Sequence, residues 1–334
     1  MSAKTLRCVL SQHIRVLPAR IPSRSLIVSY TQQHKHFKTS RYRASYSTSR
    51  TTASTATSSP EIETEMSEPT GLIAKSGIEL LTFGTPNGVK ISVLLEELKE
   101  AYGKEYTWQG INIMKNTQKE PWFTALNPNG RIPVVVDHDR NGFAVFEGMA
   151  ILSYLTRHYD PEHKFSFPVD SDEYSEAEQW MAWQHGGIGP MQGQANHFFR
   201  FAKEKIPYAV QRYVGESERL YGILDKRLEN RDFIVGPGRG KYSIADINLL
   251  GWVSMGVFSG LDIKMFPNVD KWVARCHERP AVQKGFDIPF KTQYTNDLIL
   301  KAREEDPEAK KQAEESLKFL NEAKEKYGYK YSSP

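Results

Sequence analysis

The sequence predicts a two-domain α+β protein in which a small mixed α/β domain precedes an all-helical domain. Its 334 residues suit about two domains of ordinary size. Residues 77–160 alternate short apolar strands with amphipathic helices, whereas from Glu173 onward the apolar periodicity is helical. We therefore expect the α/β domain over 77–160 and the helical domain over 170–290, between a leader (1–66) and a charged helical tail (291–334).

The expected order in the first domain is strand, helix, strand, short helix, strand, strand, helix. The first strand is expected over Ile78–Phe83, and the helix Val89–Tyr102 has apolar residues at the 3–4 spacing of one buried face. The remaining elements are expected over Tyr106–Ile113, Ile132–Asp137, Phe143–Phe146 and, as a helix, Met149–Tyr159. Two βα units followed by a hairpin and a helix favour a small mixed sheet with helices on both faces.

The junction between the first strand and the first helix reads Thr85-Pro-Asn-Gly88. Pro, Asn and Gly in this order suit a type I turn. The same residues also place a hydroxyl, an amide and bare backbone N–H groups at a helix start, which is where anions bind. We expect both features: a turn in the backbone that leaves Thr85 and Asn87 at the mouth of a helix beginning near Val89.

The net charge of +4 averages two unlike parts of the chain. Residues 1–60 hold ten of the 44 basic residues and no acidic one, which leaves 34 basic against 40 acidic residues and a net charge of −6 over 61–334. A body of this charge does not predict nucleic-acid binding. No apolar run approaches about 18 residues, so we expect no membrane-spanning helix.

The leader is rich in Arg and Ser, and read as a helix it places leucines beside a basic face. This pattern is typical of a mitochondrial transit peptide, so residues 1–60 predict a mitochondrial protein. A disordered basic tail with no targeting role is the alternative. If translation starts at Met66, we expect a shorter cytoplasmic form.

The chain has two cysteines, Cys8 in the leader and Cys276 in the body, so no disulfide framework is possible within the body. Cys276 lies on a late helix, far along the chain from the first strand–helix junction, and we interpret it as a packing residue. His185 and His197 have no third ligand at a suitable spacing, so we expect no metal site.

In the helical half, Ser243 to Asp246 has the pattern of a capping box, which marks a helix start. The tail contains a second helix start at Asp306-Pro307, followed by a thin apolar stripe among Lys and Glu. The sequence leaves open whether this helix docks on the body, docks on a partner subunit or stays solvated.

Four motifs follow one another along the chain: TPNG after the first strand, NPNGRIP before the third, FEGMAIL after the fourth and YSIADI in the helical half. Together they resemble the motifs of the soluble glutathione transferases, in the same order. Four longer segments are more specific: TPNGVKISVLLEEL, WQHGGIGPMQGQANHFFRFA, IPYAVQRY and ERLYGILDKRLE. They resemble the Nu-class bacterial enzymes and the transferase-like domain of the yeast nitrogen-regulatory prion protein. The likeness covers Ile78 to Ala281. It implies a thioredoxin-like domain, a C-terminal helical bundle and a homodimer.

The resemblance implies a set of glutathione-binding residues: Gln118, Ile132, Pro133, Glu147, Gly148 and Arg212. A cis peptide at Pro133 would leave the backbone of Ile132 free to pair with the cysteinyl unit of glutathione. Glu147 and Gly148 match the pair that binds the γ-glutamyl end, where the family usually has Ser in place of Gly148. The loss of that hydroxyl removes one charge-assisted hydrogen bond, worth about 1.5–3 kcal/mol. For Arg212 a solvated helix residue is an alternative reading, and Gln118 lies in a polar loop.

The segment from Trp180 to Phe199 is expected to form a kinked helix that lines the second-substrate cleft in the family. Trp180, Trp183 and Phe198 are the candidates for that cleft, although an aromatic stripe at helical spacing is also typical of core.

Thr85 and Asn87 are the candidate catalytic residues, because both can donate a hydrogen bond to the sulfur of glutathione at a helix N-terminus. The resemblance implies thiol–disulfide exchange with two glutathiones or one glutathione disulfide bound. It thus implies glutathione as co-substrate in disulfide reduction or transfer, often with peroxidase activity, on small disulfides or peroxides. A non-catalytic regulatory or protein-binding module is the alternative function. The absence of an Asn-rich N-terminal tract from this chain argues against a prion-like regulator.

Overall fold

The computed structural model describes residues 69–328, and these begin with a four-stranded mixed sheet of order β2-β1-β3-β4. The strands are β1 (Ile78–Thr82), β2 (Tyr106–Gly110), β3 (Val134–Asp137) and β4 (Phe143–Phe146). β1 pairs in parallel with β2 and antiparallel with β3, and β3 pairs antiparallel with β4. The expected leader over 1–66, its targeting role and a start at Met66 lie outside the described residues.

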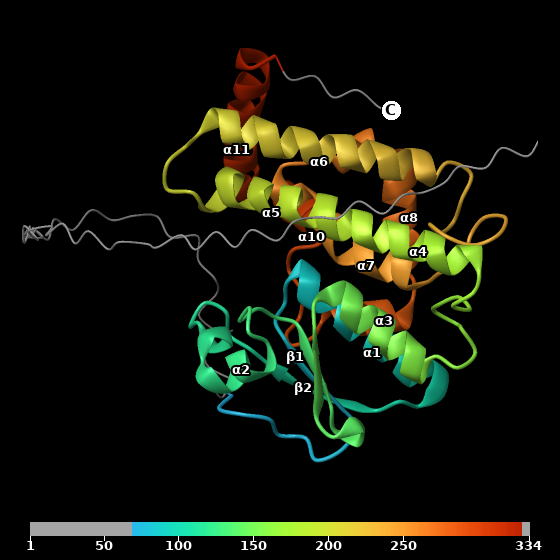
Figure 1. Cartoon of the computed structure of the whole chain (residues 1–334). Helices are drawn as coiled ribbons and strands as arrows, with labels where there is room; N and C mark the ends of the chain where they lie inside the picture. The colour runs from blue at the N-terminus through green and yellow to red at the C-terminus, as the bar shows by residue number, and fades with distance from the viewer. Residues whose placement is uncertain (1–68, 329–334) are drawn as a thin grey trace, which may run out of the picture. The chain divides into compact units, whose positions relative to one another are not determined.

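Helices cover both faces of the sheet. α1 (Pro86–Tyr102) and α3 (Gly148–Tyr159) lie side by side on one face, and the short α2 (Pro121–Leu126) lies on the other (Figure 1). Successive residues of β1 accordingly face different clusters, with Leu80 toward α1 and α3 and Leu81 toward Phe123 of α2. The predicted element order and the thioredoxin-like architecture are therefore confirmed.

The prediction that Thr85 to Gly88 is a turn before a helix at Val89 is wrong. α1 begins at Pro86, and Thr85 is its N-cap, with a side-chain oxygen that accepts the Gly88 N–H at 3.2 Å. Proline suits the first helical position because its missing N–H would have no partner there. Three strands are also shorter than expected: β1 ends at Thr82, β2 ends at Gly110, and β3 begins at Val134, where pairing on both sides starts.

The remaining described residues are mostly helical. The helices of the second domain are α4 (Asp172–Trp183), α5 (Gly189–Asn196), α6 (Pro207–Arg227), α7 (Ile244–Val253), α8 (Pro267–His277) and α9 (Pro280–Phe286). Wider π-helical segments, Gln184–Ile188 and His197–Phe201, precede and follow α5. Short 3-10 helices occupy Thr117–Lys119, His138–Arg140, Val257–Ser259 and Ile263–Met265. The π-helical segment joins α4 to α5 without leaving the helical region, where the sequence predicted a kink.

α7 is the centre of the helical domain, and all ten of its residues are buried. The predicted capping box is present: Ser243 caps the helix, and the Asp246 carboxylate accepts the Ser243 N–H at 3.0 Å. Asp246 also accepts the indole N–H of Trp272 in α8 at 2.9 Å. Burial raises the pKa of Asp246 to about 6, although these hydrogen bonds favour its charged form.

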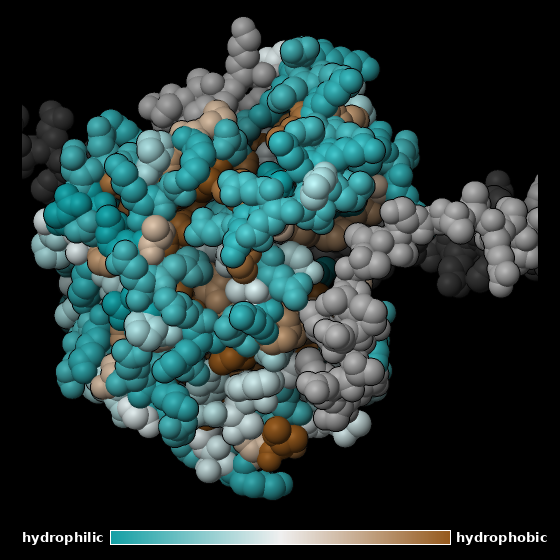
Figure 2. Space-filling view, turned by 180° about the vertical axis from the view of Figure 1, so that it is seen from behind, coloured by the Kyte–Doolittle hydropathy of each residue, from teal (hydrophilic) through white to brown (hydrophobic). Residues whose placement is uncertain are grey.

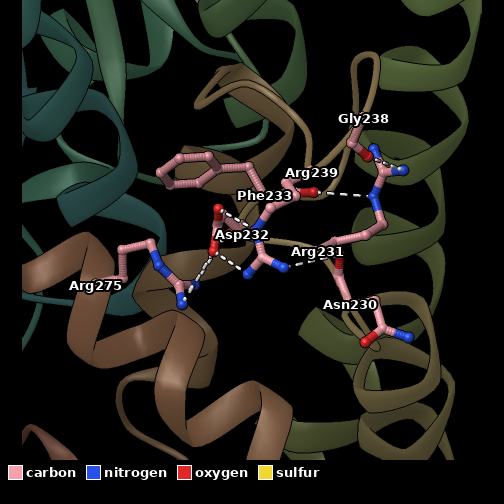
Figure 3. Close-up of polar contacts among 7 residues, drawn as sticks. All are labelled: Asn230, Arg231, Asp232, Phe233, Gly238, Arg239 and Arg275. Atoms are coloured by element: carbon pink, nitrogen blue, oxygen red, sulfur yellow. Dashed lines mark hydrogen bonds and ion pairs between the residues drawn. The ribbon is translucent and has the colours of Figure 1, made fainter.

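The loop that leads into α7 is held by arginines (Figure 3). The Asp232 carboxylate receives two hydrogen bonds from Arg239, at 2.7 and 2.6 Å, and an ion pair from Arg275 of α8 at 3.2 Å. Arg231 donates to the carbonyls of Phe233 and Gly238 at 3.2 and 3.3 Å. These contacts fix the chain just before the capping box and therefore fix where α7 begins.

The tail forms α10 (Asn296–Glu305) and α11 (Pro307–Lys326), and α11 docks on α6 of the same chain. Leu320 and Ala323 are buried, and Lys324 forms an ion pair with the buried Glu218 of α6. Of the three alternatives left open by the sequence, the described chain adopts the first, docking on the body.

From behind, hydrophilic residues cover most of the surface, and hydrophobic residues show mainly in recesses between them (Figure 2). The described helices include none with the length and apolar character needed to cross a bilayer.

Candidate active site at the first strand–helix junction

The N-terminus of α1 presents the hydroxyl of Thr85 beside the backbone N–H of Asn87. The N–H groups of Gly88 and Val89 are already bonded to Thr85, and Pro86 has none. The Thr85 oxygen accepts the Gly88 N–H, so its own O–H remains available as a donor. The positive end of the helix dipole lies at the same place. A ligand group bound here would therefore meet a positive potential and a hydroxyl that can donate a hydrogen bond to it.

The side chain of Asn87 also forms a hydrogen bond within the protein. Its Oδ1 accepts the indole N–H of Trp252, in α7, at 3.0 Å. An indole nitrogen only donates, so the amide oxygen must face the indole and the amide NH₂ faces away from it. Thr85 and Asn87 thus both use their acceptors within the protein and keep donors free, an arrangement that favours an anionic ligand.

The Ile132–Pro133 segment lies beside this junction. Leu81 pairs with Val134, so Pro133 stands next to the end of β1 from which Thr85 follows. The Ile132–Pro133 peptide is cis, as the resemblance implied. The pairing of β3 with β1 and with β4 begins at Val134, so the backbone of Ile132 lies outside both ladders.

Glu147 and Gly148 form the start of α3, directly after β4. Glu147 has a φ of 68°, a left-handed conformation that a non-glycine residue rarely adopts and that is often found at binding sites. Its carboxylate lies 3.0 Å from Nε2 of His185 in the helical domain. The backbone N–H groups at the start of α3 thus lie beside a half-exposed carboxylate.

Lys90 is a site residue that the sequence interpretation missed. It is fully buried, and its ammonium donates to Oε1 of Gln184 at 3.0 Å and to Oδ1 of Asn248 at 3.1 Å. A Cβ on Gly148 would stand 3.1 Å from Cδ of Lys90. Burial lowers the pKa of Lys90 to about 7, while the Glu147 carboxylate opposes the shift. Periodicity gave no signal, because α1 is buried on all sides from Gly88 to Leu95.

Gln118 and Arg212 occupy different settings. Gln118 is buried, and among the described residues its Oε1 has no hydrogen-bond partner. Arg212 is exposed on α6, and its guanidinium lies 3.9 Å from the carboxylate of Glu216. The geometry gives no contact that tests a glutathione-binding role for either residue, so both roles stay predictions.

The three residues predicted for the second-substrate cleft separate into two groups. Trp180 and Trp183 pack edge to face, with ring centroids 5.1 Å apart, against the main core. Phe198 instead stacks on Tyr213 of α6 at 5.5 Å, in the cluster that Leu320 of the tail completes. The structure therefore does not bring Phe198 together with the two tryptophans.

A different aromatic side chain lies at the junction. The ring of Phe290, after α9, packs edge to face on Phe83 with centroids 5.1 Å apart. A Cβ on Gly84 would stand 2.6 Å from this ring, so Gly84 makes room for it one residue before Thr85. The sequence interpretation missed Phe290 because it lies beyond the part of the chain that resembles the family.

Cys276 lies in α8, fully buried, and burial raises the pKa of its thiol. It is not at the strand–helix junction, and a protonated buried thiol is unreactive. Within residues 69–328 no cluster of three or more His, Cys, Asp or Glu side chains is arranged to hold a metal ion.

Comparison with known proteins adds the family. Residues 76–157 match the family described as glutathione S-transferase, N-terminal domain, and residues 193–280 match glutathione S-transferase, C-terminal domain. Disulfide-bond oxidoreductase YfcG of Escherichia coli K12 is 38% identical over 208 residues, which cover 61% of this chain and 92% of that protein.

Two solved structures show the same architecture. A glutathione transferase homologue from Lodderomyces elongisporus, solved with two glutathione molecules per subunit, superposes with a TM-score of 0.60 at 41% identity and covers 64% of this chain and 99% of its own. The nitrogen regulation fragment of the yeast prion protein Ure2p gives a TM-score of 0.60 at 31% identity, over 65% of this chain and 99% of its own. The chain described here belongs to the glutathione S-transferase family.

Proposed function

We propose that this protein is a glutathione-dependent thiol–disulfide oxidoreductase in which the sulfur of bound glutathione is the reacting atom. The observation that carries the proposal is the junction at Thr85, where two side chains direct donors outward from a helix N-terminus. A thiolate is the reactive form of a thiol, and such donors favour it. The only cysteine in the described part of the chain is buried elsewhere.

The relatives support this chemistry. YfcG is named a disulfide-bond oxidoreductase, and the Lodderomyces structure holds two glutathione molecules per subunit.

The complete reduction of one disulfide consumes two glutathione molecules. One thiolate attacks the disulfide RSSR, forming a mixed disulfide GSSR and releasing RS⁻. A second glutathione thiolate attacks the glutathione sulfur of GSSR, which forms glutathione disulfide and releases the second RS⁻. Each released thiolate takes up a proton at neutral pH.

The remaining site residues would hold the tripeptide. The free backbone of Ile132 would pair with the cysteinyl unit as an added strand. The N–H groups at the start of α3 would donate hydrogen bonds to the γ-glutamyl carboxylate, and the Glu147 carboxylate would pair with the ammonium. Lys90 lies beneath Gly148 and would add positive potential at the carboxylate.

The direct test is an assay of the full chain for glutathione-dependent reduction of a small disulfide. Thr85→Ala and Asn87→Ala should each lower kcat/KM about tenfold or more, because each removes a hydrogen bond to a charged atom. Asn321→Ala, which changes an exposed helix residue of the tail, is the matched control and should keep full activity.

Three outcomes separate the alternatives. Full activity in both site variants would refute the proposed site. A parent protein that binds glutathione but reduces no disulfide would favour a non-catalytic binding module. Activity in the parent that falls in both variants would support the proposal.

We also propose that the protein is a homodimer formed through the face of β4 and α3. β4 is an edge strand, and its Phe143 is 56% exposed. Phe143, Tyr154 and Arg157 line a hollow of about 550 Å³ on this face. A second copy would cover this aromatic surface.

Sedimentation of two variants tests the dimer. Phe143→Asp should shift the protein to the monomer, whereas Phe201→Asp, at another exposed phenylalanine, should not. A monomeric parent protein would contradict the proposal.

For the location in the cell, we propose import into mitochondria directed by residues 1–60. The acid-free, Arg- and Ser-rich composition supports this. Immunoblots of mitochondrial and cytosolic fractions test it, and the absence of an organellar pool would contradict it.

A further inference from the structure

The hydrogen bond between Trp252 and Asn87 joins the helical domain to the candidate catalytic residue. An asparagine amide has nearly the same shape in its two flipped orientations, so only its partners decide which end faces the ligand. Here the partner is an indole N–H, which must meet the oxygen. Without it, the amide could turn its oxygen toward the bound sulfur and repel a thiolate.

Trp252 itself is held firmly. Its backbone carbonyl accepts Nε2 of the fully buried Gln192 at 2.8 Å, and Oε1 of Gln192 in turn accepts the Tyr221 hydroxyl at 3.0 Å. Trp252 is 7% exposed, and its ring lies over Gly193, where a Cβ would stand 3.4 Å from Cη2. A Cβ on Gly189 would stand 3.5 Å from the indole nitrogen, so both glycines of α5 leave room for the ring.

We propose that Trp252 is a positioning residue for the reaction: its indole N–H locks the amide of Asn87 so that the NH₂ group, and not the carbonyl oxygen, faces the sulfur of bound glutathione. This inference rests on the proposed function and names a residue of the helical domain on which the same site depends. It follows that the packing of α7 on α1 controls the reactivity of a thiol bound by the first domain.

Trp252→Phe tests the proposal, because it keeps an aromatic ring and removes the N–H. The readouts are the pKa of the bound glutathione thiol, from the ultraviolet absorbance of the thiolate against pH, and the pH profile of kcat/KM. We expect the thiol pKa to rise by about one unit and kcat/KM at pH values below that pKa to fall by up to about tenfold, since one unit is there a tenfold change in thiolate fraction. The affinity for S-methylglutathione, which has no thiol to ionise, should stay within about twofold of the parent's.

A double-mutant cycle separates positioning from general damage. In an Asn87→Ala background, Trp252→Phe should change neither readout by more than about twofold, because the residue through which it acts is gone. Trp272→Phe is the matched control: it removes another indole N–H bond of the helical domain, to Asp246, and should lower stability without moving the thiol pKa.

Asn87→Asp gives an answer that does not depend on the folding of the Trp252 variant. Aspartate can still accept the indole N–H but presents an oxygen to the sulfur, so it should raise the thiol pKa more than Asn87→Ala does. An unchanged thiol pKa in Trp252→Phe, or equal effects of Trp252→Phe with and without Asn87, would overturn the inference. If Asn87→Ala itself leaves the thiol pKa and activity unchanged, the inference falls with the role assigned to Asn87, whereas a parent protein that reduces no disulfide is the result that contradicts the proposed function.

Discussion

Gly251 of α7 lies directly against the backbone carbonyl of Pro86 in the first turn of α1. A Cβ at position 251 would stand 2.3 Å from that oxygen, so only glycine permits this approach. The next residue, Trp252, reaches Asn87 from this position. The close contact of two helix backbones therefore sets the geometry of the candidate catalytic amide.

Gly251→Ala should both destabilise the fold and impair the reaction. The clash is with backbone, which cannot rotate away, so we expect a loss of about 1–3 kcal/mol or more in the free energy of unfolding, measured in urea. Gly186→Ala is the control, because a Cβ there meets nothing within 4 Å and should be neutral or slightly stabilising. Equal stability of the two variants would show that α7 does not depend on this contact.

Gly148→Ser should tighten glutathione binding. A serine hydroxyl at the start of α3 could donate to the γ-glutamyl carboxylate, a bond worth about 1.5–3 kcal/mol or roughly tenfold in the dissociation constant. The added Cβ would press on Cδ of Lys90, 3.1 Å away, so Gly148→Ala is the matched control for that crowding. Calorimetric titration of both variants isolates the hydroxyl, and equal affinities in Ser and Ala would count against its role.

Lys90 should make stability rise with pH in the alkaline range. Its pKa is about 7 when buried in the fold, against 10.5 as the ordinary value. Between these values the unfolded chain binds a proton that the folded chain lacks, so the free energy of unfolding rises by up to about 1.4 kcal/mol per pH unit. Below pH 7 both states are protonated and the contribution is constant.

Lys90→Met removes this contribution. The stability difference between the parent and the variant, from urea unfolding at several pH values, should grow in favour of the parent from about pH 7 toward 10. Lys310→Met, at an exposed tail lysine, should leave the pH dependence of the parent unchanged. A parent and a Lys90→Met variant with parallel pH profiles would contradict the shifted pKa.

The docking of the tail predicts unequal effects of two leucines on α11. Leu320 is 2% exposed against α6, whereas Leu317 is 38% exposed. Leu320→Ala should weaken the docking of α11 by about 2–5 kcal/mol, seen as faster hydrogen exchange along that helix. Leu317→Ala should change it little. Similar exchange rates in the two variants would mean that α11 is not held by this face.

Sequence reasoning recovered the parts of the fold whose signals are local. The strand–helix order of residues 78–159 follows from short-range periodicity, and the Ser243–Asp246 capping box lies within four residues. The predicted start of the first helix, near Val89, was wrong because the composition of Thr85 to Gly88 suits a turn and a helix N-terminus equally well. The extra condition was the Thr85–Gly88 hydrogen bond, which composition does not reveal.

The candidate site was recovered less completely, because its decisive contacts are distant in sequence. Trp252 bonds to a residue 165 positions away, and Lys90 bonds to partners 94 and 158 positions away. A buried lysine within an apolar helix has no pattern that distinguishes it from a solvated one. Phe198 was assigned from the resemblance, in which this helix lines the second-substrate cleft, and its stacking on Tyr213 depends on how α6 lies beside it.

The central claim is that glutathione, and not the protein, supplies the reacting sulfur. A cysteine-free chain, made by Cys8→Ser with Cys276→Ala, tests it most directly, because the sequence holds no other cysteine. We predict glutathione-dependent disulfide reduction within about twofold of the parent protein. A cysteine-free chain that still folds and binds glutathione, but has lost this activity, would contradict the account.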